Sequence, residues 1–301
     1  MANAKEIKRK IWSIQNTQKI TKAMELISTV KMKKAQDLAL SKRDFVLEMS
    51  KIFLRVEKNL ENFPLFKVWE WKKTLAVLVT SNKWLCWGYN VNIMKKVNSY
   101  IKETGEDLEY ITIWKKAANF VAKTWNSLIA DFSPEFSDYI EAYFTKDIAK
   151  MIRDEFLSWK YAKVVIFYNH YINTIKQIPV VKTSLPINAW EIKKYLWSIV
   201  DWFDELDADN KEHPRNYIFE PTANSLAEHV TPIILDMMFN DILLEAKASE
   251  HSSRMVAMKW AKDNAWKIAS NLTLIYNKAR QAVITSEVSE ISAWVESMKD
   301  M

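Results

Sequence analysis

The side chains that could carry out chemistry in this chain are few and widely separated. The single cysteine, Cys86, follows a short apolar run, and the four histidines are spread over the second half of the chain. Zinc sites need clustered Cys and His ligands, and a reactive thiol needs a group that stabilises its thiolate. We therefore expect Cys86 to be a small buried hydrophobic side chain, and His170, His213, His229 and His251 to be surface or capping residues. The sequence predicts no catalytic, cofactor-binding or metal-binding residue.

A phosphate-binding loop is the other chemistry that the sequence could encode. Residues 82–90 read NKWLCWGYN and follow the apolar run at 75–80. A P-loop needs closely spaced glycines followed by Lys and Ser or Thr. Even if Trp84 and Trp87 were glycines, this run would lack the Lys-Ser/Thr pair. We therefore expect no nucleotide site in this loop.

Positive charge is concentrated at the N-terminus. Residues 1–43 contain eleven basic and three acidic side chains, whereas the whole chain has 43 Lys and Arg against 37 Asp and Glu, a net charge of +6. This segment is either a solvated helix face or a surface that attracts acidic groups of a partner or of a nucleic acid. No set of stacking aromatic residues accompanies the basic ones, which argues against nucleic acid. The basic residues are Lys5, Lys8, Arg9, Lys10, Lys19, Lys22, Lys31, Lys33, Lys34, Lys42 and Arg43.

The composition of the 301 residues narrows the class of protein. It is 49% hydrophobic and 27% charged, which is typical of a folded protein and excludes a disordered one. One cysteine cannot form an internal disulfide, so we expect a reducing compartment. No apolar stretch reaches the 18 residues that indicate a membrane span, and the first ten residues lack the apolar core of a signal peptide. We expect a chain that does not itself cross a membrane.

Both ends of the chain are predicted to be long helices. Residues 2–63 contain neither Pro nor Gly, and apolar residues recur there at intervals of three and four. No Pro or Gly follows Pro232, and 233–301 is predicted to be a second helix whose small residues allow close packing. A long helix needs a packed partner, so we infer an antiparallel coiled coil of the two ends. The predicted seam is Ile7, Ile11, Ile14, Ile20, Met24, Ile27, Ala35 and Leu38, with Ala261, Ala265, Ile268, Leu272, Ile275, Ala279 and Ala282 opposite.

The middle of the chain has a different pattern. Short runs rich in β-branched residues alternate with helical patterns, which is typical of a Rossmann-like α/β domain with a mainly parallel sheet. Pro179 lies in the last and weakest run, so we expect that run to be an edge strand. The predicted strands are 75–80, 110–113, 163–168 and 177–183, and the predicted helices are 90–102, 115–123 and 134–157.

The predicted fold class is therefore α/β plus a long antiparallel coiled coil, in which the N- and C-terminal helices form a rod. We predict a division into three parts. Residues 1–63 form the N-terminal long helix of the coiled coil, and residues 64–210 form the α/β globular domain. Residues 211–301 form a linker and the C-terminal long helix, and the polar stretch 201–220 leads into that helix.

Two long motifs resemble a known family. The runs IQNTQKITKAMELISTVKMKKAQ at 14–36 and SSRMVAMKWAKDNAWKIASNLTLIYNKARQAVITSEVSEI at 252–291 are similar to the two signature helices of the γ subunit of F-type ATP synthase, the central rotor shaft. Between them, NKWLCWGYN and IFYNHYINTIKQIP resemble motifs of that family's middle domain. The resemblance follows the order of the family and covers essentially the whole chain.

The resemblance implies a function without bond chemistry. A γ subunit turns inside the ring of catalytic α and β subunits and transmits torque to or from the membrane-embedded c-ring, during proton-driven ATP synthesis or during ATP hydrolysis. The implied partners are the α, β and ε subunits and the c-ring, with no nucleic acid and no cofactor. The implied location is the cytoplasmic side of the cell membrane, as a peripheral protein held there only through the complex. Implied contacts with the catalytic ring are Lys22, Met24, Arg254, Arg280, Gln281, Thr285 and Glu287.

Glycine and tryptophan occur in anomalous numbers, with only 2 Gly but 14 Trp in the chain. Glycine serves positions that need positive φ or close backbone approach, and tryptophan suits neither task. Several tryptophans occur where turns or the ends of elements are expected, and several stand where the γ family has glycine or another very small residue. The first group is Trp84, Trp87, Trp114, Trp125 and Trp159, and the second is Trp84, Trp87, Trp159, Trp266 and Trp294.

One hypothesis explains both numbers. A codon that the source organism decodes as glycine, such as a reassigned UGA, would be written as tryptophan under the standard code. If the tryptophans are real, Trp260 and Trp266 should overpack the alanine-rich seam at a cost of about 1–3 kcal/mol each. Two other classes of function stay open beside the rotor: a nucleic-acid-binding coiled-coil protein, and a small-molecule enzyme built on the α/β domain.

Overall fold

The structure is a computed structural model that describes residues 4–56, 63–67, 73–133, 142–199, 220 and 222–299. These residues form two compact units. The first contains residues 1–29 and 254–301, and the second contains residues 30–253. The predicted boundaries at 63/64 and 210/211 fall beside or within segments outside the described residues, so the three-part division stays a prediction.

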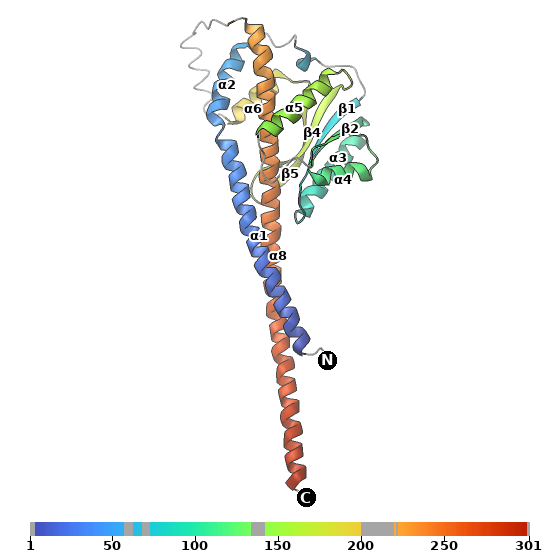
Figure 1. The fold of residues 1–301 in the computed structure, drawn as a ribbon, viewed down its shortest axis with the longest axis vertical. Coiled ribbons are helices and arrows are strands. Elements are labelled where there is room, and N and C mark those ends of the chain that lie inside the picture. The colour runs from blue at the N-terminus through green and yellow to red at the C-terminus, as the bar shows by residue number, and fades with distance from the viewer. Residues whose placement is uncertain are drawn as a thin grey trace. The chain divides into compact units, whose positions relative to one another are not determined.

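A five-stranded sheet organises the second unit (Figure 1), with the strand order β3-β2-β1-β4-β5. β1 is parallel to β2 and to β4, and β2 is parallel to β3, whereas β5 is antiparallel to β4. The mainly parallel sheet and the edge position of the strand that contains Pro179 are thus confirmed. The strands are β1 Lys73–Val79, β2 Asp107–Ile113, β3 Leu128–Asp131, β4 Lys163–Tyr171 and β5 Gln177–Leu185.

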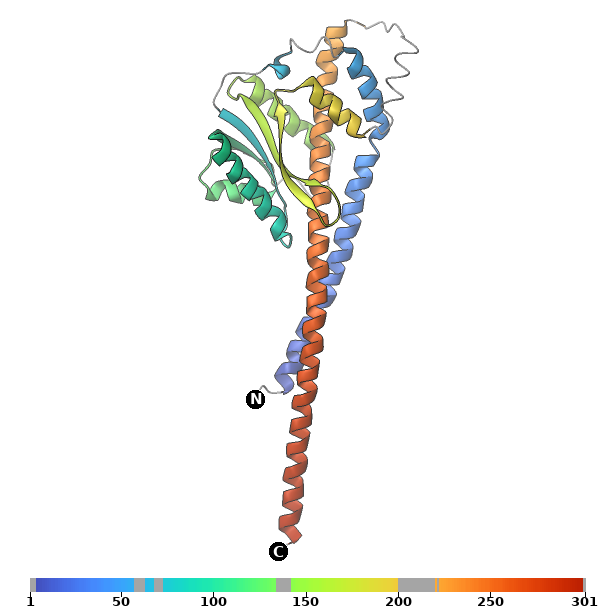
Figure 2. The ribbon, with the colours of Figure 1, turned by 180° about the vertical axis from the view of Figure 1, so that it is seen from behind.

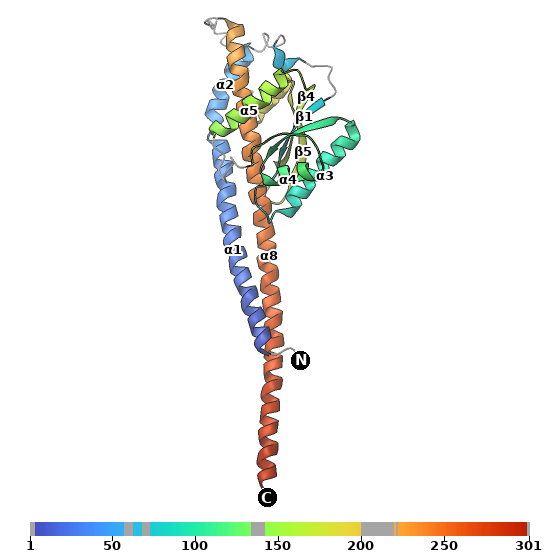
Figure 3. The same ribbon diagram turned by 45° about the vertical axis from the view of Figure 1, so that its right-hand side comes forward.

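The sheet separates two hydrophobic clusters. Because successive side chains of a strand point to opposite faces, Val77 of β1 packs in the cluster with residues of α5 and α8, and Leu78 packs in the cluster with residues of α3 and α4. β1 is buried on both faces, which explains its continuous apolar run. Figure 3 shows α3 and α4 on one side of the sheet and α5 on the other. The helices are α3 Trp87–Thr104, α4 Lys115–Lys123, α5 Ala142–Leu157 and α6 Ala189–Ile199.

The sequence analysis missed two of these elements. β3 is only four residues long and half exposed, so it has no strong apolar pattern. α6 lies where no element was expected. α4 matches its predicted bounds. Of the helix predicted at 134–157, the structure describes the part from Ala142, and residues 134–141 lie outside the described residues. A short 3-10 turn, η2, spans Pro64–Phe66.

The predicted N-terminal helix is two helices, not one. α1 spans Ala4–Leu40 and α2 spans Arg43–Val56. At the break the Ser41 hydroxyl donates a hydrogen bond to the carbonyl oxygen of Leu38 at 2.9 Å. The change of direction lets α2 bury an apolar face in the core of the second unit, which a continued α1 would not do; the buried side chains are Val46, Met49 and Phe53.

The predicted C-terminal helix begins ten residues earlier than expected. α8 spans Ala223–Lys299 and contains Pro232. A proline within a helix removes one backbone hydrogen bond and usually ends or bends the helix. Here the adjoining Thr231 is buried and its hydroxyl donates to the carbonyl oxygen of Ala227 at 2.8 Å, and Ile234 is fully buried in the core. Tertiary packing thus carries the helix through a residue that the sequence marks as a boundary.

In the first unit, residues 4–29 of α1 and 254–299 of α8 run antiparallel to one another (Figure 1), as predicted. The seam differs from the expected one in its composition. Ile7 and Ala265 are buried, and Ile11, Ile14 and Leu272 are half-buried. Thr21, Ser28 and Ala269 are also buried, so small and polar side chains replace the large ones that were expected.

Several predicted seam residues face solvent instead. Ile20, Ile27, Ile268 and Ile275 are all at least half exposed, Leu38 and Ala282 are exposed, and Ala279 is half-buried. Trp260 and Trp266, which were expected to overpack the seam, are 67% and 60% exposed and lie outside it. The three-and-four spacing therefore predicted only part of the seam, because apolar residues occur on more than one face of each helix.

Three tryptophans adopt a backbone conformation that favours glycine. φ is +68° at Trp114, +54° at Trp125 and +65° at Trp159. ψ at Trp114 is 149°, close to a region that essentially only glycine occupies. Gly105, directly after α3, has φ of +64°, and Trp125 and Trp159 lie two residues after the ends of α4 and α5. These are the positions where helices commonly end with a left-handed glycine.

Candidate functional site

The strongest concentration of directional bonds lies around α8 between Asp236 and Ser252. The apolar stripe of this segment, which includes Met238 and Ile242, packs in the core, and polar residues at spacings of four and five flank it. Together these polar residues meet several elements of the second unit. We call this set of residues the polar collar: Asp236, Asn240, Asp241, Glu245, Ala246 and Ser252 of α8, with their partners Lys42, Tyr89, Thr145, Arg153, His170, Tyr171, Thr174, Gln177 and Tyr195.

α5 supplies two of these contacts. Arg153 pairs with Asp236, and the Asn240 amide donates a hydrogen bond to the Thr145 hydroxyl at 2.8 Å. Burial raises the pKa of Asp236, although Arg153 lowers it. Figure 3 shows α5 lying across α8, which places both partners on the same side of the helix.

The turn between α1 and α2, together with α6, holds the opposite edge of the same stretch. Lys42 donates to Asn240 and pairs with Asp241 at 3.2 Å. The Tyr195 hydroxyl of α6 donates to the other oxygen of Asp241. Burial and the Asp241 carboxylate together raise the pKa of Tyr195.

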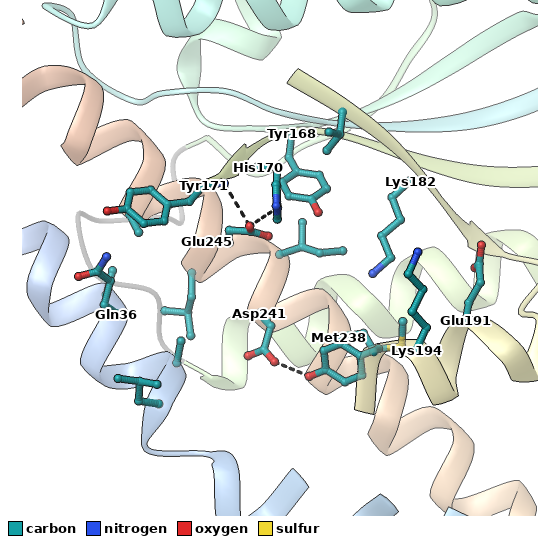
Figure 4. Close-up of a pocket in the computed structure, with 18 of the residues that line it drawn as sticks. Gln36, Tyr168, His170, Tyr171, Lys182, Glu191, Lys194, Met238, Asp241 and Glu245 are labelled. Atoms are coloured by element: carbon teal, nitrogen blue, oxygen red, sulfur yellow. Dashed lines mark hydrogen bonds and ion pairs between the residues drawn. The ribbon is translucent and has the colours of Figure 1, made fainter. Parts of the chain in front are cut away.

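β4 contacts α8 one turn further along (Figure 4). The Glu245 carboxylate accepts the backbone N–H of Tyr171 at 3.1 Å and pairs with the His170 imidazole. Burial raises the pKa of Glu245, while His170 lowers it. Burial also raises the pKa of Tyr168, and the Glu245 charge adds to that rise.

The last contacts come from α3 and from the connection between β4 and β5. The Tyr89 hydroxyl donates to the carbonyl oxygen of Ala246 at 3.1 Å. The Ser252 hydroxyl donates to the carbonyl oxygen of Thr174 at 2.6 Å and accepts the Gln177 amide at 3.4 Å. Figure 2 shows β4 and β5 beside this part of α8.

A buried ion pair lies within the same stretch of α8. Lys247 and Glu250 are 3.0 Å apart, and their side chains are 2% and 1% exposed. The Lys247 ammonium also lies 3.9 Å from the centroid of the Trp114 ring, a cation–π distance. Removal of one partner of such a buried pair is strongly destabilising, because it leaves the other charge buried and uncompensated.

The collar can hold α8 against rotation and sliding. Apolar packing alone is non-directional and allows neighbouring helices to shift. Hydrogen bonds and ion pairs have preferred geometries, and those of the collar meet α8 from α3, α5, α6, the sheet and the α1–α2 turn. A turn of α8 about its axis would break them together. Sequence reasoning missed the collar; the available signal was the set of charged and amide residues inside an otherwise apolar helix.

The candidate contact residues lie in the first unit and behave differently. Arg280, Gln281, Thr285 and Glu287 of α8 are exposed, as is Lys22 of α1, and Met24 is half-buried. The Thr285 hydroxyl donates to the carbonyl oxygen of Gln281 at 2.9 Å. Arg254 is only 6% exposed. Between the two helices, Lys262 pairs with Glu25 at 2.7 Å.

The cysteine and the histidines, which were considered as a nucleophile and as metal ligands, lie in the following surroundings. Cys86 is 1% exposed, as expected for a small buried side chain. His229 is exposed, and His170 is part of the collar. His251 is only 4% exposed, which corrects the expectation of a surface residue. His213 lies outside the described residues. No group of His, Cys, Asp and Glu among the described residues is arranged to hold a metal ion. Nor does any described helix have the length and apolarity of a membrane span.

Comparisons with known proteins agree with this architecture. A family model described as ATP synthase matches residues 3–298. An ATP synthase gamma chain of Akkermansia muciniphila is 33% identical over 301 residues, which is 99% of this chain and 100% of that relative. The gamma chain of Verminephrobacter eiseniae is 35% identical over 97% of both chains.

Solved structures show the same fold. The chain resembles one from the rotor of the Euglena gracilis mitochondrial ATP synthase, with a TM-score of 0.59, 16% identity, and coverage of 93% of this chain and 98% of the other. It also resembles one from the central stalk and c-ring of the Tetrahymena thermophila enzyme, with a TM-score of 0.55, 23% identity, and coverage of 80% and 99%. From the family model and the end-to-end relatives, the chain belongs to the ATP synthase gamma-chain family.

Proposed function

We propose that this chain is the central-stalk rotor subunit of an F-type ATP synthase and transmits torque between the c-ring and the catalytic α and β subunits. The polar collar carries the proposal, because a rotor must not let its helix slip within the domain that drives it. Directional bonds from five parts of the second unit meet this requirement. The chain itself would perform no bond chemistry; it would act by presenting different faces to the catalytic subunits, which shifts each toward a different conformation.

Association with the catalytic subunits is the direct test. The tagged full chain is co-expressed with the α and β chains of the same organism, and the purified complex is assayed for ATP hydrolysis. A bead attached through Lys150→Cys, an exposed position on α5, reports rotation. We expect stable co-purification and ATP-driven rotation of the bead. Failure to associate with α and β chains would contradict the proposal, and so would a complex that hydrolyses ATP with a stationary bead.

We further propose that exposed residues near the C-terminal end of α8, with Lys22 and Met24 of α1, contact the catalytic ring. Their exposure in the chain alone supports this role for Arg280, Gln281, Thr285 and Glu287. The burial of Arg254 suits a supporting role, in which it fixes the helix that carries them. The test compares ATP-driven rotation of Gln281→Ala with that of Lys267→Ala, an exposed position outside the set. A slower rate only for Gln281→Ala is expected; equal rates would refute the assignment.

The ε subunit and the c-ring are proposed as partners of the α/β domain, and the location as the cytoplasmic side of the cell membrane, held there through the complex. The family membership and the fold shared with rotor chains support these assignments. Fractionation tests the location: the chain should sediment with membranes and be released by washing at low ionic strength without detergent. Release only by detergent would contradict a peripheral attachment.

We also propose that most of the tryptophans written in this sequence are glycines in the protein that the source cell makes. The support is conformational, because a bulky side chain at positive φ is a genuine outlier and this chain has three such tryptophans. Two of them, Trp125 and Trp159, lie just after the ends of α4 and α5 with positive φ, as Gly105 does just after α3. A UGA codon decoded as glycine would account for these positions and for the 2 Gly and 14 Trp together.

Peptide mass spectrometry of the protein isolated from its source cell decides the matter. Peptides that cover positions 114, 125 and 159 should have the mass of the glycine form. Tryptophan at these three positions would refute the hypothesis. This result is independent of the rotor assignment, which the association experiment tests.

A further inference from the structure

The second unit contains an open pocket of about 840 Å³ beside the polar collar, lined by the end of α1, by β4 and β5, by α6 and by α8 (Figure 4). We propose that this pocket binds a small amphiphilic anion, an apolar molecule that carries one carboxylate or phosphate group, and that Lys182 and Lys194 receive its charge. The proposal concerns a ligand of the isolated chain, so it stands or fails separately from the rotor function.

The carboxylates that line the pocket near α8 already have partners. Asp241 accepts from Tyr195 and pairs with Lys42, and Glu245 accepts the backbone N–H of Tyr171 and pairs with His170. Each of these carboxylates therefore already has a cation or a hydrogen-bond donor at its oxygens within the protein. A cationic ligand would have to compete with these internal bonds.

The lysines of the opposite wall are not matched in this way. Lys182 of β5 and Lys194 of α6 form no ion pair or hydrogen bond within the described part of the chain, and the Lys182 ammonium lies 5.8 Å from the centroid of the Tyr195 ring. Figure 4 shows the two lysine side chains approaching one another from β5 and α6. Burial lowers the pKa of Lys182, and the Lys194 charge lowers it further. The negative charge of an anion placed between the two lysines would offset both the cost of burying the Lys182 charge and the repulsion from Lys194.

Glu191 is the carboxylate with which a bound anion would compete for Lys182. Its charge heads the influences that raise the pKa of Lys182, followed by those of Glu245 and Asp241. It is half-buried on α6 and forms no ion pair with Lys182. A bound anion would thus share the Lys182 charge with Glu191. Removal of the Glu191 charge should therefore increase the affinity for the anion.

The rest of the lining explains why the ligand should also have an apolar body. Val180 of β5 and Met238 and Ile242 of α8 border the same space. A pocket of this size falls in the range of about 300–1,000 Å³ that is usual for small-molecule sites, which combine apolar walls with a few polar groups. A single charged head on a short hydrocarbon chain fits that combination better than a multiply charged ion does.

Calorimetric titration of the full chain with octanoate and with octyl phosphate tests the proposal, with octanol as the uncharged control. We expect saturable binding of at least one of the two anions and weaker binding of octanol; comparison of the anions identifies the preferred head group. Lys182→Met should weaken anion binding by about tenfold or more, because a hydrogen bond to a charged group is lost. Lys182→Arg should retain most of it, and Glu191→Gln should tighten it.

Lys150→Met, which removes an exposed lysine from α5, is the matched control and should bind like the unmodified chain. Circular dichroism spectra establish that each variant is folded. Absence of binding by both anions would overturn the proposal. Octanol binding as tight as that of the anions would also overturn it, as would unchanged anion affinity in folded Lys182→Met.

Discussion

The surroundings of α8 differ between the two units. In the second unit, α8 is bonded on several sides by the collar, and it carries the buried pair Lys247–Glu250. In the first unit, every residue of α8 from Arg280 to Glu296 is exposed, and Lys262 of α8 forms an ion pair with Glu25 of α1. One stretch is therefore fixed by its own chain, and the other leaves its side chains available to a partner.

This difference shows how a single helix can serve two mechanical roles. Torque must pass along the helix between the stretch that is held and the stretch that is exposed. In the held stretch, directional bonds add a preferred geometry that the non-directional hydrophobic effect lacks. The exposed stretch includes Ile284, Ile291 and Trp294, apolar side chains that are between 49% and 72% exposed in the chain alone. The contrast predicts larger effects of substitution in the held stretch.

The largest effect is expected for Glu250→Ala. Removal of this carboxylate leaves the Lys247 ammonium, 2% exposed, without the charge that it pairs with. Breaking a buried pair in this way typically costs about 3–5 kcal/mol. Urea unfolding of the full chain, followed by circular dichroism, measures the loss. The double variant Lys247→Met/Glu250→Leu should recover most of it, and a double variant as unstable as Glu250→Ala would contradict this explanation.

The pH dependence of stability should depend on Glu245. Burial raises the pKa of this carboxyl above 4.5 in the folded chain, so the folded state holds a proton that the unfolded state releases. Stability from this group is then fully present below about pH 4.5 and is lost as the pH rises through the folded pKa. Glu245→Gln should flatten the fall in the free energy of unfolding on going from acid to neutral pH. Identical pH profiles for both proteins would show that another group is responsible.

The same substitution should have opposite signs in the two units. Trp125→Gly in the second unit replaces a 94% exposed side chain at φ of +54° and should raise the free energy of unfolding by about 1 kcal/mol. Trp260→Gly in the first unit replaces an exposed residue inside a helix and should lower it by about 0.5 kcal/mol. Thermal unfolding of the recombinant chain made with the standard code measures both. A loss of stability in Trp125→Gly would contradict the conformational argument for glycine.

The smallest effect is expected for Lys262→Met. This lysine and Glu25 form a solvent-accessible pair, and such pairs contribute little because water and salt screen the charges. We expect the same urea midpoint as in the unmodified chain, and the same midpoint at high and low salt. A clear loss of stability would show that the coiled coil depends on directional bonds as the second unit does.

The sequence was sufficient for the features that local pattern determines. The β-branched runs that became β1, β2 and β4 are largely buried and that of β5 is half-buried, so their composition is largely fixed by their position. α4 was predicted with its bounds, and Pro179 identified the edge strand because proline cannot donate a ladder hydrogen bond. Long stretches without Pro or Gly predicted both terminal helices.

Only the tertiary structure decided where those helices break, continue and face. The burial of Phe53 determines that α2 departs from α1 at Ser41, and the packing around Pro232 carries α8 through a proline. Hydrophobicity predicts that Ile20 is buried and Ser28 exposed, but in the structure Ile20 is exposed and Ser28 is buried. The close approach of the two helices favours small side chains between them. The collar joins residues up to 199 positions apart, such as Lys42 and Asp241. Sequence periodicity acts within one element, whereas such bonds exist only after the elements have packed.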